Sequence, residues 1–134
     1  MIYKVLTLNE WKLAKETGVI ITNIDKNDGF VHLSTARQLN ATLSMYFQNS
    51  SKVMLLEVSH NKVKKILKYE PTNSDSSRKG FFYHLYGELL IEYISKFWLL
   101  ERGAFNIPDE ILIQAEADDL SIIRNRVRTW IWAS

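Results

Sequence analysis

The chain has 134 residues, 46% of them hydrophobic, and a formal net charge of +2 at pH 7, which suits one ordinary domain with its own core and predicts no strongly charged partner for the whole molecule. Cysteine is absent, so disulfides, a thiol nucleophile and thiolate metal ligands are excluded, and we expect a cytoplasmic protein. The start lacks a signal-peptide pattern and no apolar run is long enough to span a bilayer, so we expect no membrane partner.

The first predicted element is a strand over residues 2–7, followed by a helix. Thr7 and Glu10 have the spacing of a capping box, in which the hydroxyl caps the helix and the glutamate bonds back to the chain. Gly18 is expected to end this helix. We expect a loop over residues 19–28, because polar turn-forming residues crowd into it, namely Asn23, Asp25, Asn27 and Asp28.

A short buried strand is predicted at residues 29–33, and it leads directly into a second helix. Ser34 or Thr35 is expected to cap that helix, which covers residues 36–49. One face of the helix is apolar, as shown by the spacing of Leu39, Leu43, Tyr46 and Phe47. His32 therefore falls at the rim of the sheet, where it is a candidate ligand contact.

The second half of the chain is predicted to be mostly strand. A lysine-rich turn is expected at residues 61–65. The polar segment 71–80 is long for a loop in a compact domain, which is typical of a functional lid. Early helices and late strands together favour an α+β domain with a bent or split sheet. The predicted strands cover residues 53–58, 66–69, 81–86 and 89–100.

Residues 101–134 are predicted to be a helical extension that follows a domain of residues 1–100. Pro108 begins a good first helical turn. From Asp118 onward, apolar residues recur every three or four positions, at Leu120, Ile123, Val127, Trp130 and Ile131. This stripe packs either on its own domain, which we favour, or on a second copy of the chain to form a homodimer.

Two aromatic-flanked histidines, His32 and His84, are the main chemical signal in the chain. A neutral imidazole offers one donor and one acceptor, which suits the vicinal hydroxyls of a ribose. The alternative for His32 is a buried structural histidine bonded to the backbone, and the alternative for His84 is that HLYG is simply a strand and a turn that ends at Gly87. The histidines lack the spacing of metal ligands, so we predict no metal site. No glycine-rich phosphate loop or G-x-S-x-G elbow is present.

Three segments resemble a widespread bacterial family of uncharacterised small proteins. They are the dipeptide Tyr3-Lys4 in the first predicted strand, the segment GFVHLST at residues 29–35 and the segment HLYG at residues 84–87. The likeness covers roughly residues 2–100. This family in turn resembles the ADP-ribosyltransferase fold superfamily, in which a split sheet grips NAD between its halves. The resemblance implies an α+β fold with a split, mostly antiparallel β-sheet of that type.

Residues 30–34 are also similar to a segment of RNA 2′-phosphotransferases. That likeness implies that His32 contacts the ribose or phosphate of NAD and that Ser34 and Thr35 lie by the nicotinamide. The site it implies has His32 and His84 as catalytic residues, with Tyr3, Lys4, Ser34, Thr35 and Tyr86 binding NAD. Those enzymes have Arg or His where this chain has Tyr3-Lys4. The transferases also place a glutamate on a late strand that is unmatched here, and Glu57 and Glu70 are candidate replacements.

Two functional hypotheses therefore stand side by side. One is a transferase of ADP-ribosyl or 2′-phosphoryl groups, with NAD as its substrate. The other is a non-catalytic module of the same fold, which binds a nucleotide-like ligand or serves only to oligomerise. The expected partner is a small molecule or nucleotide. Basic residues crowd into residues 52–79, but we favour a solvated surface there over a phosphate-binding face, so a nucleic acid is an unfavoured though open alternative.

Overall fold

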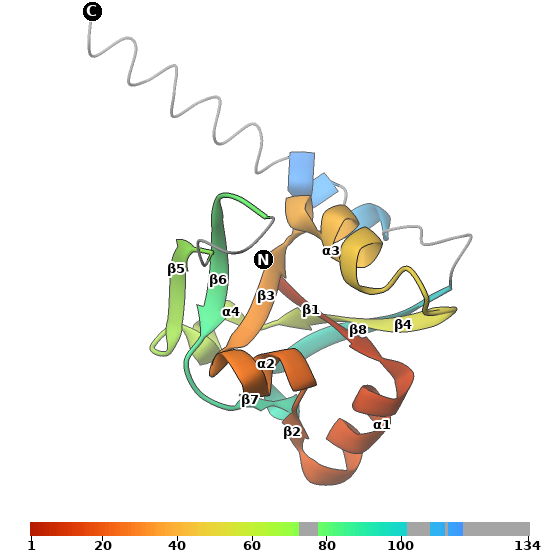
Figure 1. Ribbon diagram of the computed structural model, residues 1–134, viewed down its shortest axis with the longest axis horizontal. Helices are drawn as coiled ribbons and strands as arrows, with labels where there is room; N and C mark the ends of the chain where they lie inside the picture. The colour runs from red at the N-terminus through yellow and green to blue at the C-terminus, as the bar shows by residue number, and fades with distance from the viewer. Residues whose placement is uncertain (73–77, 102–107, 112, 117–134) are drawn as a thin grey trace, which may run out of the picture.

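The computed structural model of the protein describes residues 1–72, 78–101, 108–111 and 113–116. Its centre is a six-stranded antiparallel sheet in the order β5-β6-β3-β1-β4-β8, and β2 pairs with β7 in a second, two-stranded sheet (Figure 1). The α+β class and the mostly antiparallel sheet that the sequence predicts are thus confirmed. The strands are β1 (Ile2–Thr7), β2 (Val19–Ile20), β3 (Val31–Thr35), β4 (Lys52–Val58), β5 (Leu67–Pro71), β6 (Phe81–Leu85), β7 (Leu89–Leu90) and β8 (Ile94–Glu101).

Short helices connect and cover these strands. Helix α1 is capped as predicted: Glu10 N–H donates to Thr7 Oγ1 at 3.1 Å, and Thr7 N–H donates to Glu10 Oε1 at 2.9 Å. Gly18 ends α1 in the left-handed conformation, at a φ of 82°. The helical segments in the described part of the chain with full bounds are α1 (Leu8–Thr17), α2 (Asn23–Asp28), the 3-10 turn η1 (Ala36–Gln38), α3 (Leu39–Tyr46), α4 (His60–Val63) and the 3-10 turn η2 (Ile91–Tyr93).

The loop predicted over residues 19–28 is wrong, because this segment contains β2 and α2. The hydroxyl of Thr22 accepts the N–H of Asp25 at 3.3 Å and so caps α2. Gly29 then ends the helix at a φ of 79°. The polar residues that suggested a loop are therefore part of a short helix that Thr22 caps.

Two other predicted boundaries also change. The helix predicted over residues 36–49 begins as the 3-10 turn η1 and ends at Tyr46. The strand predicted over residues 89–100 is divided by η2 into the short β7 and the long β8. The stripe predicted from Asp118 onward lies outside the described residues.

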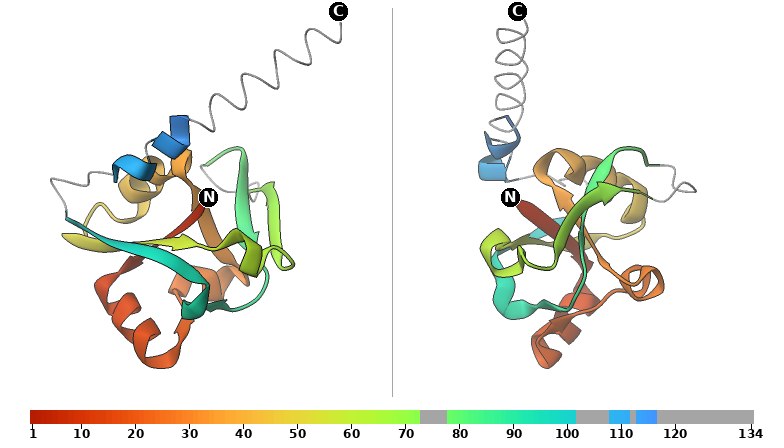
Figure 2. Two further views of the ribbon diagram at one scale, coloured as in Figure 1. Left: turned by 180° about the vertical axis from the view of Figure 1, so that it is seen from behind. Right: turned by 90° about the vertical axis from the view of Figure 1, so that its left-hand side faces the viewer.

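The apolar side chains form one cluster on each face of the sheet, because alternate residues of a strand point to opposite faces. Tyr3 and Val5 of β1 pack with α3 on one face, while Ile2 and Leu6 pack with α1 on the other. Figures 1 and 2 show α3 and α1 on opposite sides of β1. Ile111 is also buried in the cluster under α3. In the described residues, no helix is long and apolar enough to cross a membrane.

The sheet opens between its two central strands. β1 pairs with β4 over six residues, but with β3 over only two, Ile2 with Thr35 and Tyr3 with Ser34. From Lys4 onward, β1 and β3 no longer pair. Helix α2 immediately precedes β3 and brings its acidic residues to this opening. The sheet is thus continuous but weakly joined at its centre.

Gly87, the glycine of the HLYG segment, lies where β6 leaves the sheet. A Cβ atom added at this position would lie 2.8 Å from Ile66 Cδ1, closer than real Cβ contacts allow. The neighbouring Tyr86 N–H donates to the carbonyl of Ile66 at 2.7 Å. A side chain at residue 87 would therefore require the side chain of Ile66, the residue before β5, to move.

Candidate functional site

The two histidines singled out in the sequence lie next to each other in the sheet. His32 on β3 and His84 on β6 are direct partners in the antiparallel ladder, and their ring centroids are 5.7 Å apart. The ring of Phe30 packs against both, at centroid distances of 4.7 Å to His32 and 4.1 Å to His84. The opening of the sheet lies on the other side of β3, so the histidines meet through strand pairing and not across the gap.

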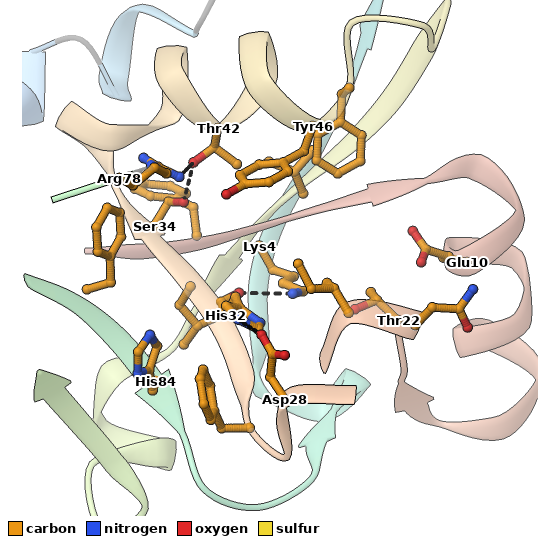
Figure 3. A pocket seen from close by; sticks show the side chains of 18 of the residues that line it. Lys4, Glu10, Thr22, Asp28, His32, Ser34, Thr42, Tyr46, Arg78 and His84 are labelled. Atoms are coloured by element: carbon orange, nitrogen blue, oxygen red, sulfur yellow. Dashed lines mark hydrogen bonds and ion pairs between the residues drawn. The ribbon is translucent and has the colours of Figure 1, made fainter. Parts of the chain in front are cut away.

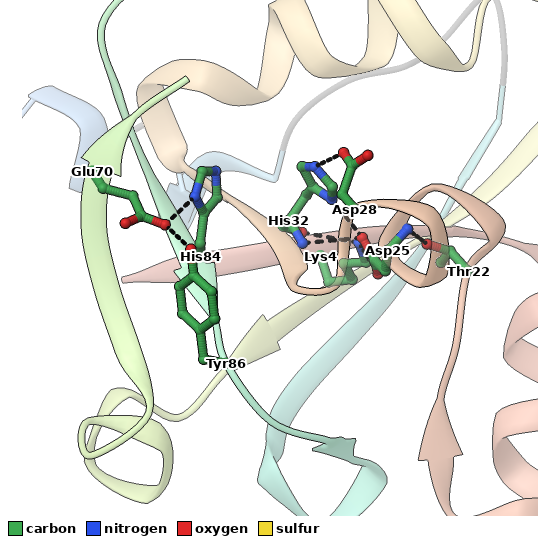
Figure 4. Close-up of polar contacts among 8 residues, drawn as sticks. All are labelled: Lys4, Thr22, Asp25, Asp28, His32, Glu70, His84 and Tyr86. Carbon is green, nitrogen blue, oxygen red and sulfur yellow. Dashed lines mark hydrogen bonds and ion pairs between the residues drawn. The ribbon is translucent and has the colours of Figure 1, made fainter. Parts of the chain in front are cut away.

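The His32 ring lies between two carboxylates (Figure 4). Its Nδ1 is 2.7 Å from Asp25 Oδ1, and its Nε2 is 2.8 Å from Asp28 Oδ2. The backbone N–H of His32 also donates to Asp25 Oδ1, at 3.1 Å. An ionised carboxylate can only accept hydrogen bonds, so both ring contacts are hydrogen bonds at once when both ring nitrogens carry a proton. Both ring nitrogens of His32 therefore lie against hydrogen-bond acceptors.

Lys4 closes this cluster from β1, across the opening of the sheet. Its Nζ is 2.8 Å from Asp25 Oδ2 and donates to the backbone carbonyl of His32 at 2.9 Å. Both Lys4 and Asp25 are buried. Burial lowers the pKa of Lys4, and the charge of Asp25 only partly opposes this. Burial acts to raise the pKa of Asp25, but the His32 hydrogen bond and the Lys4 charge outweigh it, so this pKa lies below its usual value.

His84 has a carboxylate partner of its own, on the side away from Lys4. Glu70 Oε1 is 2.8 Å from His84 Nδ1, and the hydroxyl of Tyr86 donates to the same oxygen. The Tyr86 hydrogen bond, followed by the one from His84, lowers the pKa of Glu70, and Glu70 in turn raises the pKa of Tyr86. Because the carboxylate accepts at Nδ1, a neutral His84 carries its proton there. Its Nε2 is then an acceptor.

A cavity of about 480 Å³ lies over the opening between β1 and β3 (Figure 3). Of the residues that the sequence places in a site, Tyr3, Lys4, His32, Ser34 and His84 line this cavity. Thr35 and Tyr86 lie outside its lining: Thr35 caps the turn η1, with its N–H donating to Gln38 Oε1 at 3.0 Å, and Tyr86 is bonded to Glu70 behind His84.

The two glutamates proposed as replacements for a catalytic carboxylate do not reach the cavity either. Glu57 is buried on β4, where it accepts the hydroxyl of Ser95 at 2.8 Å. Glu70 acts on His84 from behind. The carboxylates in the cavity lining are instead Glu10 and Asp28.

The far wall of the cavity consists of Ser34, Thr42 and Arg78. Ser34 Oγ and Thr42 Oγ1 are 2.8 Å apart, and Arg78 Nη1 donates to Thr42 Oγ1 at 3.0 Å. The guanidinium lies over the ring of Phe82, 4.4 Å from its centroid. Figure 3 shows these three side chains together on one side of the cavity, with Glu10 and Thr22 on the opposite side.

Sequence reasoning missed several of these residues. The spacing of Thr22 and Asp25 is itself a capping pattern, and it could have revealed α2, the helix that carries the two carboxylates facing His32. No local pattern identifies Thr42 or Arg78, because they reach the cavity from α3 and from the residues before β6 only after folding.

Fold and site together define an α+β protein with a histidine-lined cavity at a weakly joined sheet. The chain belongs to the family described as a protein of unknown function, DUF952, whose model matches residues 5–97. The predicted membership of an uncharacterised family is confirmed to this extent. A search of curated proteins found no match.

Solved structures of protein CC0527 from Caulobacter crescentus are similar to this chain. The crystal structure is 30% identical, with a TM-score of 0.70, and the match covers 83% of this chain and 97% of that one. The solution NMR structure is 32% identical, with a TM-score of 0.63, and the match covers 75% of this chain and 84% of that one.

Proposed function

We propose that the cavity binds a nucleotide of the NAD type and that the protein is a transferase acting at the ribose of this ligand, on an ADP-ribosyltransferase-like fold. The observation that carries the proposal is the pairing of His32 and His84 beside the opening of the sheet. A cavity of about 480 Å³ also falls within the range of roughly 300–1,000 Å³ that is typical of small-molecule sites.

The two imidazoles are suited to opposite parts of an acid–base reaction. His84, with its proton held at Nδ1 by Glu70, offers Nε2 as a base. His32 lies between Asp25 and Asp28, and its Nε2–H holds a ribose hydroxyl when that hydroxyl displaces Asp28. Carboxylates on both histidines also fix the orientation of the rings, as in other acid–base sites.

For ADP-ribosyl transfer, these roles give a balanced reaction. The acceptor's nucleophile forms a bond to the ribose carbon while the bond to nicotinamide breaks, and the bonding electrons neutralise the positive ring of the leaving group. His84 takes the proton from the nucleophile. Positive charge develops on the sugar, and Asp28, the lining carboxylate that contacts His32, is available to stabilise it.

A non-catalytic binding module is the second candidate, and one observation favours it. Both carboxylates of the cavity lining are already engaged, Asp28 with His32 and Glu10 with the backbone N–H of Thr7. A carboxylate that is held in this way is less able to follow charge developing on a sugar. The two candidates predict binding alike and differ in turnover.

Calorimetric titration with NAD and ADP-ribose tests the shared prediction of binding. We expect wild-type protein to bind, and a His84→Gln variant to bind at least tenfold more weakly. His60→Gln is the matched control, because His60 is exposed on α4 and meets only the edge of Tyr83. Equal affinity of the two variants would remove His84 from the site, and failure of wild-type protein to bind either ligand would overturn the proposal.

Release of nicotinamide from labelled NAD then separates the two candidates. We expect release that depends on protein and is lost in His84→Gln but kept in His60→Gln. Binding without release identifies the non-catalytic module.

A further inference from the structure

We propose that Ser34, Thr42 and Arg78 form a phosphate-binding subsite at one end of the cavity. The inference rests on the proposed function, because it states which end of the cavity takes the phosphate groups of a nucleotide. Ser34 lies on β3, Thr42 on α3 and Arg78 just before β6. Their polar atoms form a row of hydrogen bonds, 2.8 Å from Ser34 to Thr42 and 3.0 Å from Thr42 to Arg78.

The hydroxyl groups of Ser34 and Thr42 together leave one hydrogen-bond donor for a ligand. Thr42 Oγ1 accepts from Arg78, and the two hydroxyls share one hydrogen bond. Whichever hydroxyl donates in that bond, the proton of the other is unused. Within the described residues, neither Ser34 nor Thr42 makes a further side-chain hydrogen bond. The pair therefore offers one hydroxyl proton to an acceptor in the cavity.

The guanidinium of Arg78 is held in place by contacts on several sides. Besides Thr42, it donates to the carbonyl of Gln38 at 3.5 Å, and its Cζ lies 4.4 Å from the centroid of the Phe82 ring, within range of a cation–π contact. A planar guanidinium with a fixed orientation matches the oxygens of a phosphate, which it binds through two parallel N–H groups. Arg78 also lines the cavity.

Lys4 also lines the cavity, and it was predicted to bind NAD. Its ammonium group is instead paired with the buried Asp25 and bonded to the backbone of His32. The lining on this side also carries Asp28 and Glu10, which repel an anion. An anionic group is therefore favoured at Arg78, and the opposite end suits an uncharged or cationic group such as a nicotinamide ring.

The test compares ligands with and without phosphate, in matched variants. Arg78→Gln removes the guanidinium, whereas Arg37→Gln makes the same change of charge at an exposed residue outside the cavity lining. We expect Arg78→Gln to bind NAD and ADP-ribose at least tenfold more weakly than Arg37→Gln does. Nicotinamide riboside, which lacks phosphate, is expected to bind both variants equally.

A third variant, Thr42→Val, removes one hydroxyl with little change of shape and keeps the test valid if Arg78→Gln does not fold. We expect it to weaken NAD binding severalfold and to leave nicotinamide riboside unaffected. If NAD binds wild-type protein and all three variants alike, the subsite is overturned while the proposed function stands. The same holds if Arg78→Gln weakens nicotinamide riboside as much as NAD.

Failure of the proposed function has a different signature, which is that wild-type protein binds neither NAD nor ADP-ribose. The subsite is then tested with inorganic pyrophosphate and amide chemical shifts. Shifts of the Ser34 and Thr42 amides that are present in wild-type protein and absent in Arg78→Gln support the subsite. No shift in wild-type protein overturns it.

Discussion

The two histidine clusters use the same contact in different surroundings. In each, a carboxylate lies within 2.8 Å of Nδ1 and fixes the ring. Asp25 is buried and shared with the ammonium of Lys4, whereas Glu70 is partly exposed on the edge strand β5 and shared with the hydroxyl of Tyr86. Removing one partner of a buried ion pair destabilises the fold strongly, whereas a more exposed carboxylate mainly affects the hydrogen bonds and pKa values of its neighbours. The His32 cluster thus couples the site to stability, and the His84 cluster does so only weakly.

The largest expected effect is on stability, from Asp25→Ala. This change leaves the ammonium of Lys4 buried without its counter-charge, which typically costs about 3–5 kcal/mol. Urea unfolding at neutral pH measures it. Asp28→Ala is the matched control, because Asp28 is 36% exposed and contacts only the outer nitrogen of His32. A loss of stability in Asp25→Ala no greater than in Asp28→Ala would contradict the distinction between the clusters.

The second prediction concerns the pH dependence of stability. The pKa of Asp25 lies below its usual 3.8 in the folded state, so its stabilising contribution is complete above that value and disappears as the pH falls through the folded-state pKa. The difference in unfolding free energy between wild-type protein and Asp25→Asn should therefore be constant above about pH 5 and shrink in stronger acid. A difference that stays constant down to the acid unfolding of both proteins would show that Asp25 does not titrate as described.

The smallest effect on stability is expected from Glu70→Gln, which sharpens the comparison through a different readout. Loss of the carboxylate removes the cause of the raised pKa of Tyr86, so this pKa should fall towards 10.0. A phenolate absorbance titration detects the change, and the urea midpoint should stay close to that of wild-type protein. Asp28→Asn should leave the Tyr86 titration unaltered. An unchanged Tyr86 pKa in Glu70→Gln would mean that the hydrogen bond between the two groups does not form in solution.

Local signals in the sequence predicted the local parts of the fold. The capping box of Thr7 and Glu10, the glycine at residue 18 and the β-branched runs of β1 and β4 all act within a few residues, so they can be read directly. The polar segment of α2 has the same composition as a turn, and only the Thr22 cap distinguishes the two. The position of His84 in the site is set by the register of β3 and β6, which brings it opposite His32.

The carboxylate partners of the histidines could not be predicted in the same way. Glu70 meets His84 because the antiparallel pairing of β5 and β6 places Lys68 opposite His84 and Glu70 two residues further along, on the same face. Asp25 meets Lys4 because α2 turns back over the opening of the sheet. Both contacts depend on how separate elements pack, and one of them engages Lys4, which was predicted to bind NAD, in a buried ion pair.

The short ladder between β1 and β3 divides the sheet into two halves that are joined by few residue pairs. One half consists of β5, β6 and β3, and the other consists of β1, β4 and β8. Separating the halves breaks two residue pairs and the contacts of Lys4 and also parts apolar side chains of one cluster, such as Leu6 and Leu33, whereas parting β1 from β4 breaks six residue pairs. The strand pairing beside the cavity is thus shorter than the pairing between β1 and β4, and the ammonium of Lys4 bridges the two halves. Amide protons between β1 and β3 should therefore exchange with solvent before those between β1 and β4.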